Sequence, residues 1–296
     1  MKQKIYFILS MIIFGAVGVF AKYIDLTSSE IALFMSLIGS LFLLIICLCT
    51  KYKISWQNMK KNAIALFIAS IALSGNWIFL FQSYKETTIA NAALSYYFAP
   101  VLVIMLSPIV LKEKLSLQKM IWVGAALFGL YLIMQSSGME AAEHNLLGIF
   151  YGLIAACFYA VLTLVNKFIR NMNGLENTFI QLVLSFVMLL PYVLITDGFK
   201  LFQIAGDSVI WMLLLGILHG GIGFYLFFSG MGGLKGQSIA ILSYIDPLTS
   251  LLISALIIGE KMTLLQMIGA ALLLGSTLIS EVSRNRKDPY RNRKYT

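Results

Sequence analysis

The chain contains 296 residues, of which 59% are hydrophobic and only 12% are charged, and its 22 Lys and Arg outnumber its 13 Asp and Glu to give a net charge of +9. Charged residues make up about a quarter of an ordinary soluble domain, so this composition excludes a soluble enzyme, a nucleic-acid-binding protein and a disordered scaffold. Cys47, Cys49 and Cys157 all lie in apolar stretches, which excludes a disulfide framework and a cysteine-rich metal site. The composition indicates an all-α integral membrane protein in a lipid bilayer, with no nucleic-acid partner.

Apolar runs of the length needed to cross a membrane follow one another along the whole chain. A bilayer core about 30 Å thick requires roughly 20 apolar residues in a helix. The runs cover residues 5–21, 31–50, 63–84, 87–111, 120–139, 145–166, 177–196, 208–234, 236–259 and 262–280. The connectors between them are too short for a soluble domain, so we expect ten transmembrane helices and a basic tail over residues 282–296.

The first run admits a second interpretation. Lys2 and Lys4 precede it and small residues end it near Ala21, a pattern that a cleavable signal peptide also shows. The run is long for the apolar region of a signal peptide, and another run begins within ten residues. Both features favour a transmembrane helix.

The basic residues fall mainly on one side of the expected spans. If the N-terminus is cytoplasmic, eighteen of the 22 Lys and Arg are cytoplasmic, and only Lys22, Lys85, Lys200 and Lys261 lie outside. Positive residues in short loops are retained on the cytoplasmic side of a membrane. We therefore expect a multi-pass protein of the plasma (inner) membrane with both termini in the cytoplasm. The basic tail is expected to act as a stop-transfer anchor, with binding of anionic lipid as the alternative.

The two halves of the chain resemble each other. A shift of 147 residues superposes Tyr97, Pro100, Ser107, Glu113, Lys114, Leu117, Met120 and Ile121 on Tyr244, Pro247, Ser254, Glu260, Lys261, Leu264, Met267 and Ile268. We expect a first five-helix repeat over residues 1–139 and a second over residues 140–281. Five is an odd number, so the second repeat must be inverted in the membrane. Inverted repeats are typical of secondary transporters.

These repeated segments resemble a known family. Residues 94–100 and 112–114, with their counterparts 242–247 and 259–261, are similar to the paired signatures of the EamA family of the drug/metabolite transporter (DMT) superfamily. Residues 14–22 are similar to the family's Trp-Gly to Lys pattern, with Phe14 in place of Trp. The resemblance implies a ten-helix carrier of small metabolites such as amino acids, nucleosides, sugars, amines or drugs, and it favours export.

The two halves differ at one position of the family pattern. Gly269 follows Glu260 at the family's usual interval, whereas the first half has Trp122 at the equivalent place and Gly124 two residues further on. The resemblance therefore does not carry over to the packing of these two helices in the same way.

Asp246 is the only charged residue within the ten runs. A charge near the bilayer centre costs roughly 2.5–3.5 kcal/mol on insertion scales, and such residues are usually functional. Ser243, Ser250 and Ser254 lie on the same helical face, which predicts a polar stripe facing a cavity. We expect Asp246 to carry a coupling proton or to pair with a cationic substrate. The alternative is a structural aspartate that satisfies backbone groups opened by Pro247, since the resembled family usually has an acidic residue there.

Two prolines occupy equivalent positions in the fourth and ninth runs. Pro100 and Pro247 each remove a backbone hydrogen bond and interrupt a helix. Interrupted helices at matching places in two repeats point to the binding site or hinge of a transporter. Pro108 has no counterpart and predicts only a local kink.

Aromatic and polar residues near these interruptions form the predicted substrate site. Besides Asp246, the candidates are Asn76, Trp77, Tyr96, Tyr97, His219, Tyr225 and Tyr244. Aromatic rings beside a few hydrogen-bonding groups bind amphipathic or cationic molecules. Packing between helices or a place in an interfacial aromatic belt is the alternative for these rings. For His219 the alternative is an interhelical histidine beside the small residues Gly216 and Gly220.

Two glutamates in equivalent turns are predicted to be structural. Glu113 and Glu260 precede Ser116 and Thr263, which suit helix N-caps, and a carboxylate there favours the positive end of the next helix. Lys22 is expected to extend to the lipid headgroups, with a cavity-facing role as the alternative that the family pattern suggests.

The expected function is that of a secondary active transporter rather than an enzyme. An enzyme site needs paired carboxylates, clustered ligands or a nucleophile with its base, and the sequence offers none of these. We expect no metal and no cofactor, and no nucleotide-binding loop is present, so a proton or substrate gradient must drive transport. The predicted protein exports a small metabolite, such as an amino acid, an amine or a drug-like amphipathic molecule, by alternating access. A passive channel or a membrane receptor is the alternative.

Overall fold

The computed structural model describes residues 2–52, 54–111, 117–135, 142–196, 206–231, 242 and 245–287, and every regular element in these ranges is a helix. Within these ranges six helices are long and apolar enough to cross a membrane: Gln3–Lys22, Ser28–Cys49, Ala63–Glu86, His144–Asn166, Gly174–Thr196 and Ser208–Phe227. Four shorter apolar helices occupy the places of the other expected spans: Ile89–Val103, Met120–Ile133, Ile245–Ile258 and Leu264–Ser276. The all-α membrane fold is confirmed, and the full count of ten spans stays a prediction.

Several spans are divided into shorter helices. The α-helices are α1 Lys2–Gly15, α2 Val17–Lys22, α3 Ser28–Cys49, α4 Trp56–Lys61, α5 Ala63–Glu86, α6 Ile89–Tyr96, α7 Ala99–Leu111, α8 Leu117–Gln135, α9 Ala142–Asn166, α10 Gly174–Thr196, α11 Gly206–Leu215, α12 Phe224–Met231, α14 Ile245–Ile253 and α15 Leu264–Lys287. Two further segments, η2 Gly216–Gly223 and η3 Ser254–Ile258, are π-helical.

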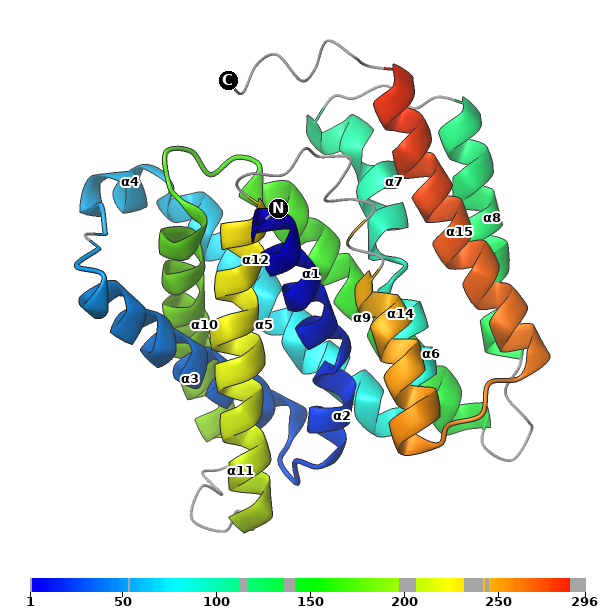
Figure 1. The fold of residues 1–296 in the computed structure, drawn as a ribbon, viewed down its shortest axis with the longest axis horizontal. Coiled ribbons are helices and arrows are strands. Elements are labelled where there is room, and N and C mark those ends of the chain that lie inside the picture. Colours follow the sequence, from blue (N-terminus) through cyan, green and yellow to red (C-terminus); the bar gives the residue numbers. More distant parts are fainter. Residues whose placement is uncertain are drawn as a thin grey trace.

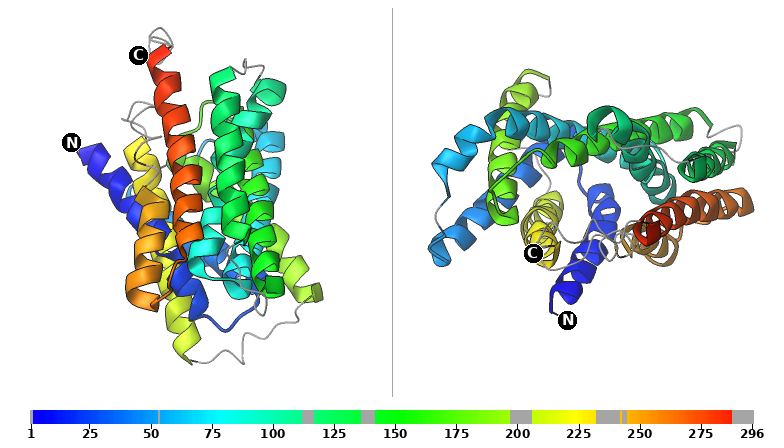
Figure 2. Two further views of the ribbon diagram at one scale, coloured as in Figure 1. Left: turned by 90° about the vertical axis from the view of Figure 1, so that its right-hand side faces the viewer. Right: turned by 90° about the horizontal axis from the view of Figure 1, so that it is seen from above.

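The helices form an elongated bundle (Figures 1 and 2). Helices α3 and α4 lie at one edge, α8 and α15 lie side by side at the other, and α1, α5 and α9 run through the middle. Helix α1 begins and α15 ends at the same end of the bundle (Figure 1). We call the opposite end, where α2 ends and α6 and α15 begin, the Lys22 end.

The fourth span is broken just before its proline. Helix α6 ends at Tyr96 and α7 begins at Ala99, so that Pro100 is the second residue of the new helix. Proline is tolerated in the first turn of a helix, where its missing N–H has no intrahelical acceptor to lose. In the same way α14 begins at Ile245, and Pro247 lies in its first turn. The expected function of the two prolines as hinges stays a prediction.

Glycines allow three pairs of helices to approach closely. A Cβ atom on Gly129 in α8 would lie 2.6 Å from the backbone oxygen of Gly269 in α15, and the reverse holds for Gly269. Gly220 in η2 faces Gly39 in α3, and a Cβ atom on Gly39 would lie 3.1 Å from the Cα of Gly220. Small residues at such contacts let membrane helices pack backbone to backbone. A Cβ on Gly15 in α1 would lie 2.6 Å from the backbone oxygen of Asp246, so α1 packs directly on the start of α14.

Candidate functional site

Asp246 lies in the first turn of α14 and its side chain is partly buried. Four tyrosine hydroxyls interact electrostatically with its carboxylate: those of Tyr84 from α5, Tyr96 from α6, Tyr97 from the break after α6, and Tyr159 from α9. We call Asp246 and these four residues the tyrosine cluster. Its members come from both halves of the chain.

The rings of the tyrosine cluster pack against one another edge to face. The Tyr96 ring centroid lies 5.6 Å from that of Tyr97 and 5.5 Å from that of Tyr159, with interplanar angles of 73° and 72°. Edge-to-face pairs at this spacing are favourable and hold ring orientations. Tyr96 and Tyr97, which are adjacent in the sequence, both interact with Asp246 at the break before Pro100.

The cluster contains buried polar groups that lack a hydrogen bond of normal geometry. The Tyr97 hydroxyl lies beside the Asp246 carboxylate but has no hydrogen-bond partner of normal geometry, and the buried Ser250 Oγ, one helical turn after Asp246, has none either. Lys22 forms an ion pair with Glu260, and His144 forms one with Glu86, so neither of these pairs involves Asp246. Because buried polar groups are normally satisfied, this arrangement is suited to a ligand that supplies positive charge and a hydrogen bond.

The sequence candidates of α5 lie on two sides of their helix. Asn76 is buried, donates from Nδ2 to the Ala155 carbonyl oxygen at 2.9 Å, and interacts with the Tyr96 hydroxyl. It therefore ties α5 to α9 and reaches the tyrosine cluster. Trp77 is buried in the apolar core, with its ring 6.2 Å from that of Phe224.

The candidates of the eighth span do not join the tyrosine cluster. His219 is buried in η2, and its ring meets Phe20 at 5.1 Å in an edge-to-face contact. Its ring nitrogens have no hydrogen-bond partner of normal geometry, although they interact with the carbonyls of Ile13 and Leu215. Tyr225 in α12 is 38% exposed. Tyr244 lies outside the described residues.

Sequence reasoning missed Tyr84 and Tyr159. Tyr84 lies beside Lys85 at the end of the third span, where the sequence does not distinguish it from an interfacial tyrosine, yet it is buried. Tyr159 lies two thirds of the way along the expected sixth span, and its hydroxyl in an otherwise apolar stretch was a usable signal. Which face of α9 it occupies follows only from the packing of that helix.

Glu260 makes contacts that its sequence position did not predict. Its carboxylate accepts hydrogen bonds from the backbone N–H groups of Ile89 and Ala90 at 3.0 and 3.2 Å, so it caps the start of α6 rather than that of α15. It also pairs with Lys22 Nζ at 2.6 Å. Helix α15 is capped instead by Thr263, whose Oγ1 accepts from the Gln266 N–H at 3.2 Å. Glu113 lies outside the described residues.

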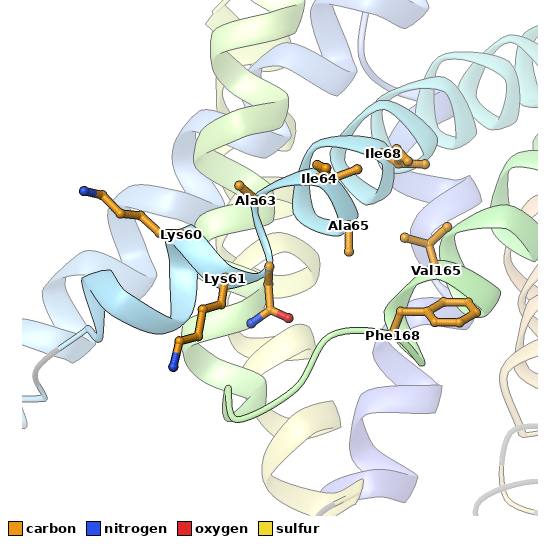
Figure 3. A pocket seen from close by; sticks show the side chains of 9 residues that line it. Lys60, Lys61, Ala63, Ile64, Ala65, Ile68, Val165 and Phe168 are labelled. Carbon is orange, nitrogen blue, oxygen red and sulfur yellow. The ribbon is translucent and has the colours of Figure 1, made fainter.

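A surface cavity of about 480 Å³ lies away from the tyrosine cluster, where α4 meets α5 near the end of α9. Figure 3 shows Ile64, Ala65 and Ile68 facing Val165 and Phe168 across it. The cavity is open and lined mainly by apolar side chains, with lysines only at its margin. Among the described residues, no acidic side chain lines it.

Comparison with known proteins decides the family. Residues 1–135 and 146–281 each match the EamA-like transporter family. The chain belongs to this family. It is therefore a membrane transporter, and neither the family nor the relatives named below indicate an enzyme class.

Relatives of this EamA-like chain match it along nearly their whole length. "Uncharacterized transporter YxxF" of Bacillus subtilis (strain 168) is 30% identical over 292 residues, covering 97% of this chain and 93% of that protein. An "Uncharacterized transporter" of Archaeoglobus fulgidus is 30% identical over 274 residues, covering 92% of this chain and 94% of that protein. A solved crystal structure superposes with a TM-score of 0.66 at 17% identity, covering 95% of this chain and 98% of that chain, which shows a shared fold.

Proposed function

We propose that this EamA-like transporter is a secondary active carrier that exports a small metabolite, such as an amino acid, an amine or a drug-like amphipathic molecule, by alternating access between its two halves. The observation that carries the proposal is the tyrosine cluster. Its carboxylate has no described counter-ion, and its rings come from helices of both halves, α5 and α6 on one side and α9 on the other. A site at the junction of two halves can open to either side when the halves move.

The chemistry of the cluster favours a positively charged group on the substrate. A carboxylate away from bulk water attracts a cation more strongly than an exposed one does. The faces of tyrosine rings attract an ammonium group through their quadrupole, and their edges pack on an apolar body. An amine with an apolar or aromatic portion satisfies both features. When no cation is bound, a proton on Asp246 neutralises the same charge, which couples export to the proton gradient.

The test compares wild-type protein with Asp246→Asn, which removes the charge and keeps the shape. Metabolites are profiled inside and outside cells that express matched amounts of each protein. We expect a compound that the wild type moves and the variant does not, because Asn can neither carry the proton nor neutralise a cation. Glu86→Gln, which removes an acid that pairs with His144 outside the cluster, is the matched control and should behave as wild type. Wild-type export by Asp246→Asn contradicts the assignment.

Once a transported compound is found, flux measurements in reconstituted vesicles distinguish a carrier mechanism from a channel mechanism. A carrier that alternates access shows saturable uptake, and unlabelled compound loaded inside the vesicles drives the accumulation of labelled compound from outside. A channel shows neither property. Unsaturable flux without exchange therefore contradicts alternating access.

A further inference from the structure

Glu260 brings together three elements at the Lys22 end of the bundle. Its Oε1 lies 2.6 Å from Lys22 Nζ at the end of α2 and accepts from the Ile89 N–H of α6 at 3.0 Å. Its Oε2 accepts from the Ala90 N–H at 3.2 Å and from the Ser254 hydroxyl of η3. Both carboxylate oxygens are therefore used twice. We call these contacts the Glu260 latch.

The latch connects the two halves of the chain. Lys22 and the start of α6 belong to the first half, whereas Glu260 and Ser254 belong to the second. Hydrogen bonds beside the latch also join the two halves: Gln266 Nε2 of α15 donates to Asn91 Oδ1 of α6 at 2.8 Å. The Asn91 amide in turn donates to Asn145 Oδ1 at 2.8 Å. The latch therefore lies within a larger polar seam between the halves.

The latch is charged at neutral pH. Burial alone would raise the pKa of the Glu260 carboxyl. This effect is outweighed by the hydrogen bonds from Lys22, Ser254 and the Ile89 amide and by the charge of Lys22, so the pKa of Glu260 is lowered. Hydrogen bonds to an ionised carboxylate are roughly twice as strong as neutral ones, and a negative charge at a helix N-terminus is favourable. Side-chain exposure of 11% for Glu260 and 30% for Lys22 limits screening by water.

The latch acts on the helices that carry the tyrosine cluster. Helix α6, which Glu260 caps, ends at Tyr96 and is followed directly by Tyr97. Ser254 follows Asp246 by eight residues, about two helical turns along the same segment of chain. The Glu260 carboxylate thus contacts the start of α6 and the residue that follows α14, the two segments that carry Tyr96 and Asp246.

We propose that Glu260 is a positioning residue of the transport cycle. It keeps the Lys22 end of the bundle closed and holds α6 and α14 in register. It must release Lys22 and α6 before the tyrosine cluster can open toward that end. The inference rests on the proposed function only in assuming alternating access. It concerns the closing of one end of the molecule and needs no knowledge of the substrate.

The test measures access to the interior rather than transport. Cys47, Cys49 and Cys157 are replaced by Ser or Ala, and Ser250→Cys is added as a reporter that is 2% exposed and lies between Asp246 and Ser254. A membrane-impermeant thiol reagent is applied to right-side-out and to inverted vesicles, and the labelling rate is followed. We expect Glu260→Gln to speed labelling about tenfold from the face that exposes the Lys22 end, equivalent to about 1.4 kcal/mol, and to leave the other face unchanged.

Matched variants separate a latch from general loosening. Glu260→Asp keeps the charge and should retain slow labelling, and Glu86→Gln, on a neighbouring acid at the same end, should have no effect. If Glu260→Gln does not fold, Lys22→Met replaces it, because this change removes the ion pair and leaves the cap on α6 in place. Equal rates in Glu260→Gln and the parent, or the same acceleration from both faces, overturn the proposal. A failed transport assay with the expected labelling overturns only the proposed function.

Discussion

At the scale of single residues, the Tyr97 hydroxyl is the polar group of the tyrosine cluster best placed to bind a substrate. It lies beside Asp246, is shielded from water and has no hydrogen-bond partner of normal geometry among the described residues. A bound substrate that hydrogen-bonds to this hydroxyl replaces its imperfect interaction with Asp246 and contributes to the binding free energy. The phenyl ring makes a separate contribution through its edge-to-face contact with Tyr96.

Tyr97→Phe separates these two contributions, because it removes the hydroxyl and keeps the ring. We expect the apparent affinity for the transported compound to fall about tenfold, the effect of losing one hydrogen bond to a charged or polar group, while the maximal rate changes little. The concentration dependence of transport in vesicles measures both quantities. Tyr131→Phe, at a tyrosine of α8 that is 53% exposed, is the control. An unchanged affinity in Tyr97→Phe places the hydroxyl outside the substrate site.

The sequence predicted the centre of the candidate site better than its periphery. Asp246 was identifiable because one charge in a long apolar run is conspicuous whatever the packing. Tyr84, Tyr159 and Tyr225 show the limit of this reasoning: whether a tyrosine faces the cluster depends on how its helix is rotated against its neighbours. The contacts of Glu260 with α6 could not be predicted for a related reason, because α6 lies about 170 residues away in the sequence.

At the scale of elements, the contact between α8 and α15 depends on two glycines. Each glycine Cα faces the backbone oxygen of the other, at a distance that leaves no room for a side chain. Gly269 was expected from the sequence to matter for packing, but its partner is Gly129, and neither Trp122 nor Gly124 takes that place. A Cβ on Gly124 meets nothing within 4 Å.

Gly129→Val should therefore force α8 and α15 apart. The added side chain meets backbone atoms, which cannot move aside as a flexible side chain can, and such overpacking costs about 1–3 kcal/mol. We expect the melting temperature of the detergent-solubilised protein to fall by roughly 5 °C, as measured by fluorescence of a thiol-reactive dye during heating. Gly124→Val, in the same helix, should leave it unchanged. Equal effects of the two substitutions would show that the close approach does not stabilise the fold.

The helical elements themselves were more predictable than their irregularities. The break before Pro100, and the position of Pro247 in the first turn of α14, follow from the chemistry of proline, which any sequence reveals. The π-helical segment η2 does not follow from such a rule. It contains Gly220, Gly221 and Gly223, which pack against Gly39, Phe42 and Phe14 respectively, so its wider turn reflects contacts with α1 and α3 that the local sequence does not specify.

At the scale of the whole molecule, α5 and α9 form a frame that crosses the bundle. Side-chain hydrogen bonds to backbone oxygens tie α5 to α9 and the turn after it at three levels: Asn62 to Arg170 at 2.9 Å, Asn76 to Ala155 at 2.9 Å, and Ser83 to Gly148 at 2.7 Å. The two halves are therefore expected to move about this frame, with the larger displacements in the segments α6–α7 and α14–η3. Two members of the tyrosine cluster, Tyr84 and Tyr159, belong to the frame, and the remaining three belong to the interrupted segments.

The frame also gives a direct test of the predicted orientation, because its two ends carry residues suited to labelling. Lys61 is the last residue of α4, two positions before α5 begins. His144, whose side chain is 84% exposed, pairs with Glu86 at the far end of α5. The distribution of basic residues places Lys61 in the cytoplasm and His144 outside. In a protein without its three native cysteines, a membrane-impermeant thiol reagent added to intact spheroplasts should label His144→Cys at once, and Lys61→Cys only after the membrane is permeabilised. The reverse pattern would invert the topology and move the Glu260 latch to the cytoplasmic end, whereas labelling of both cysteines from one side would mean that α5 does not cross the membrane.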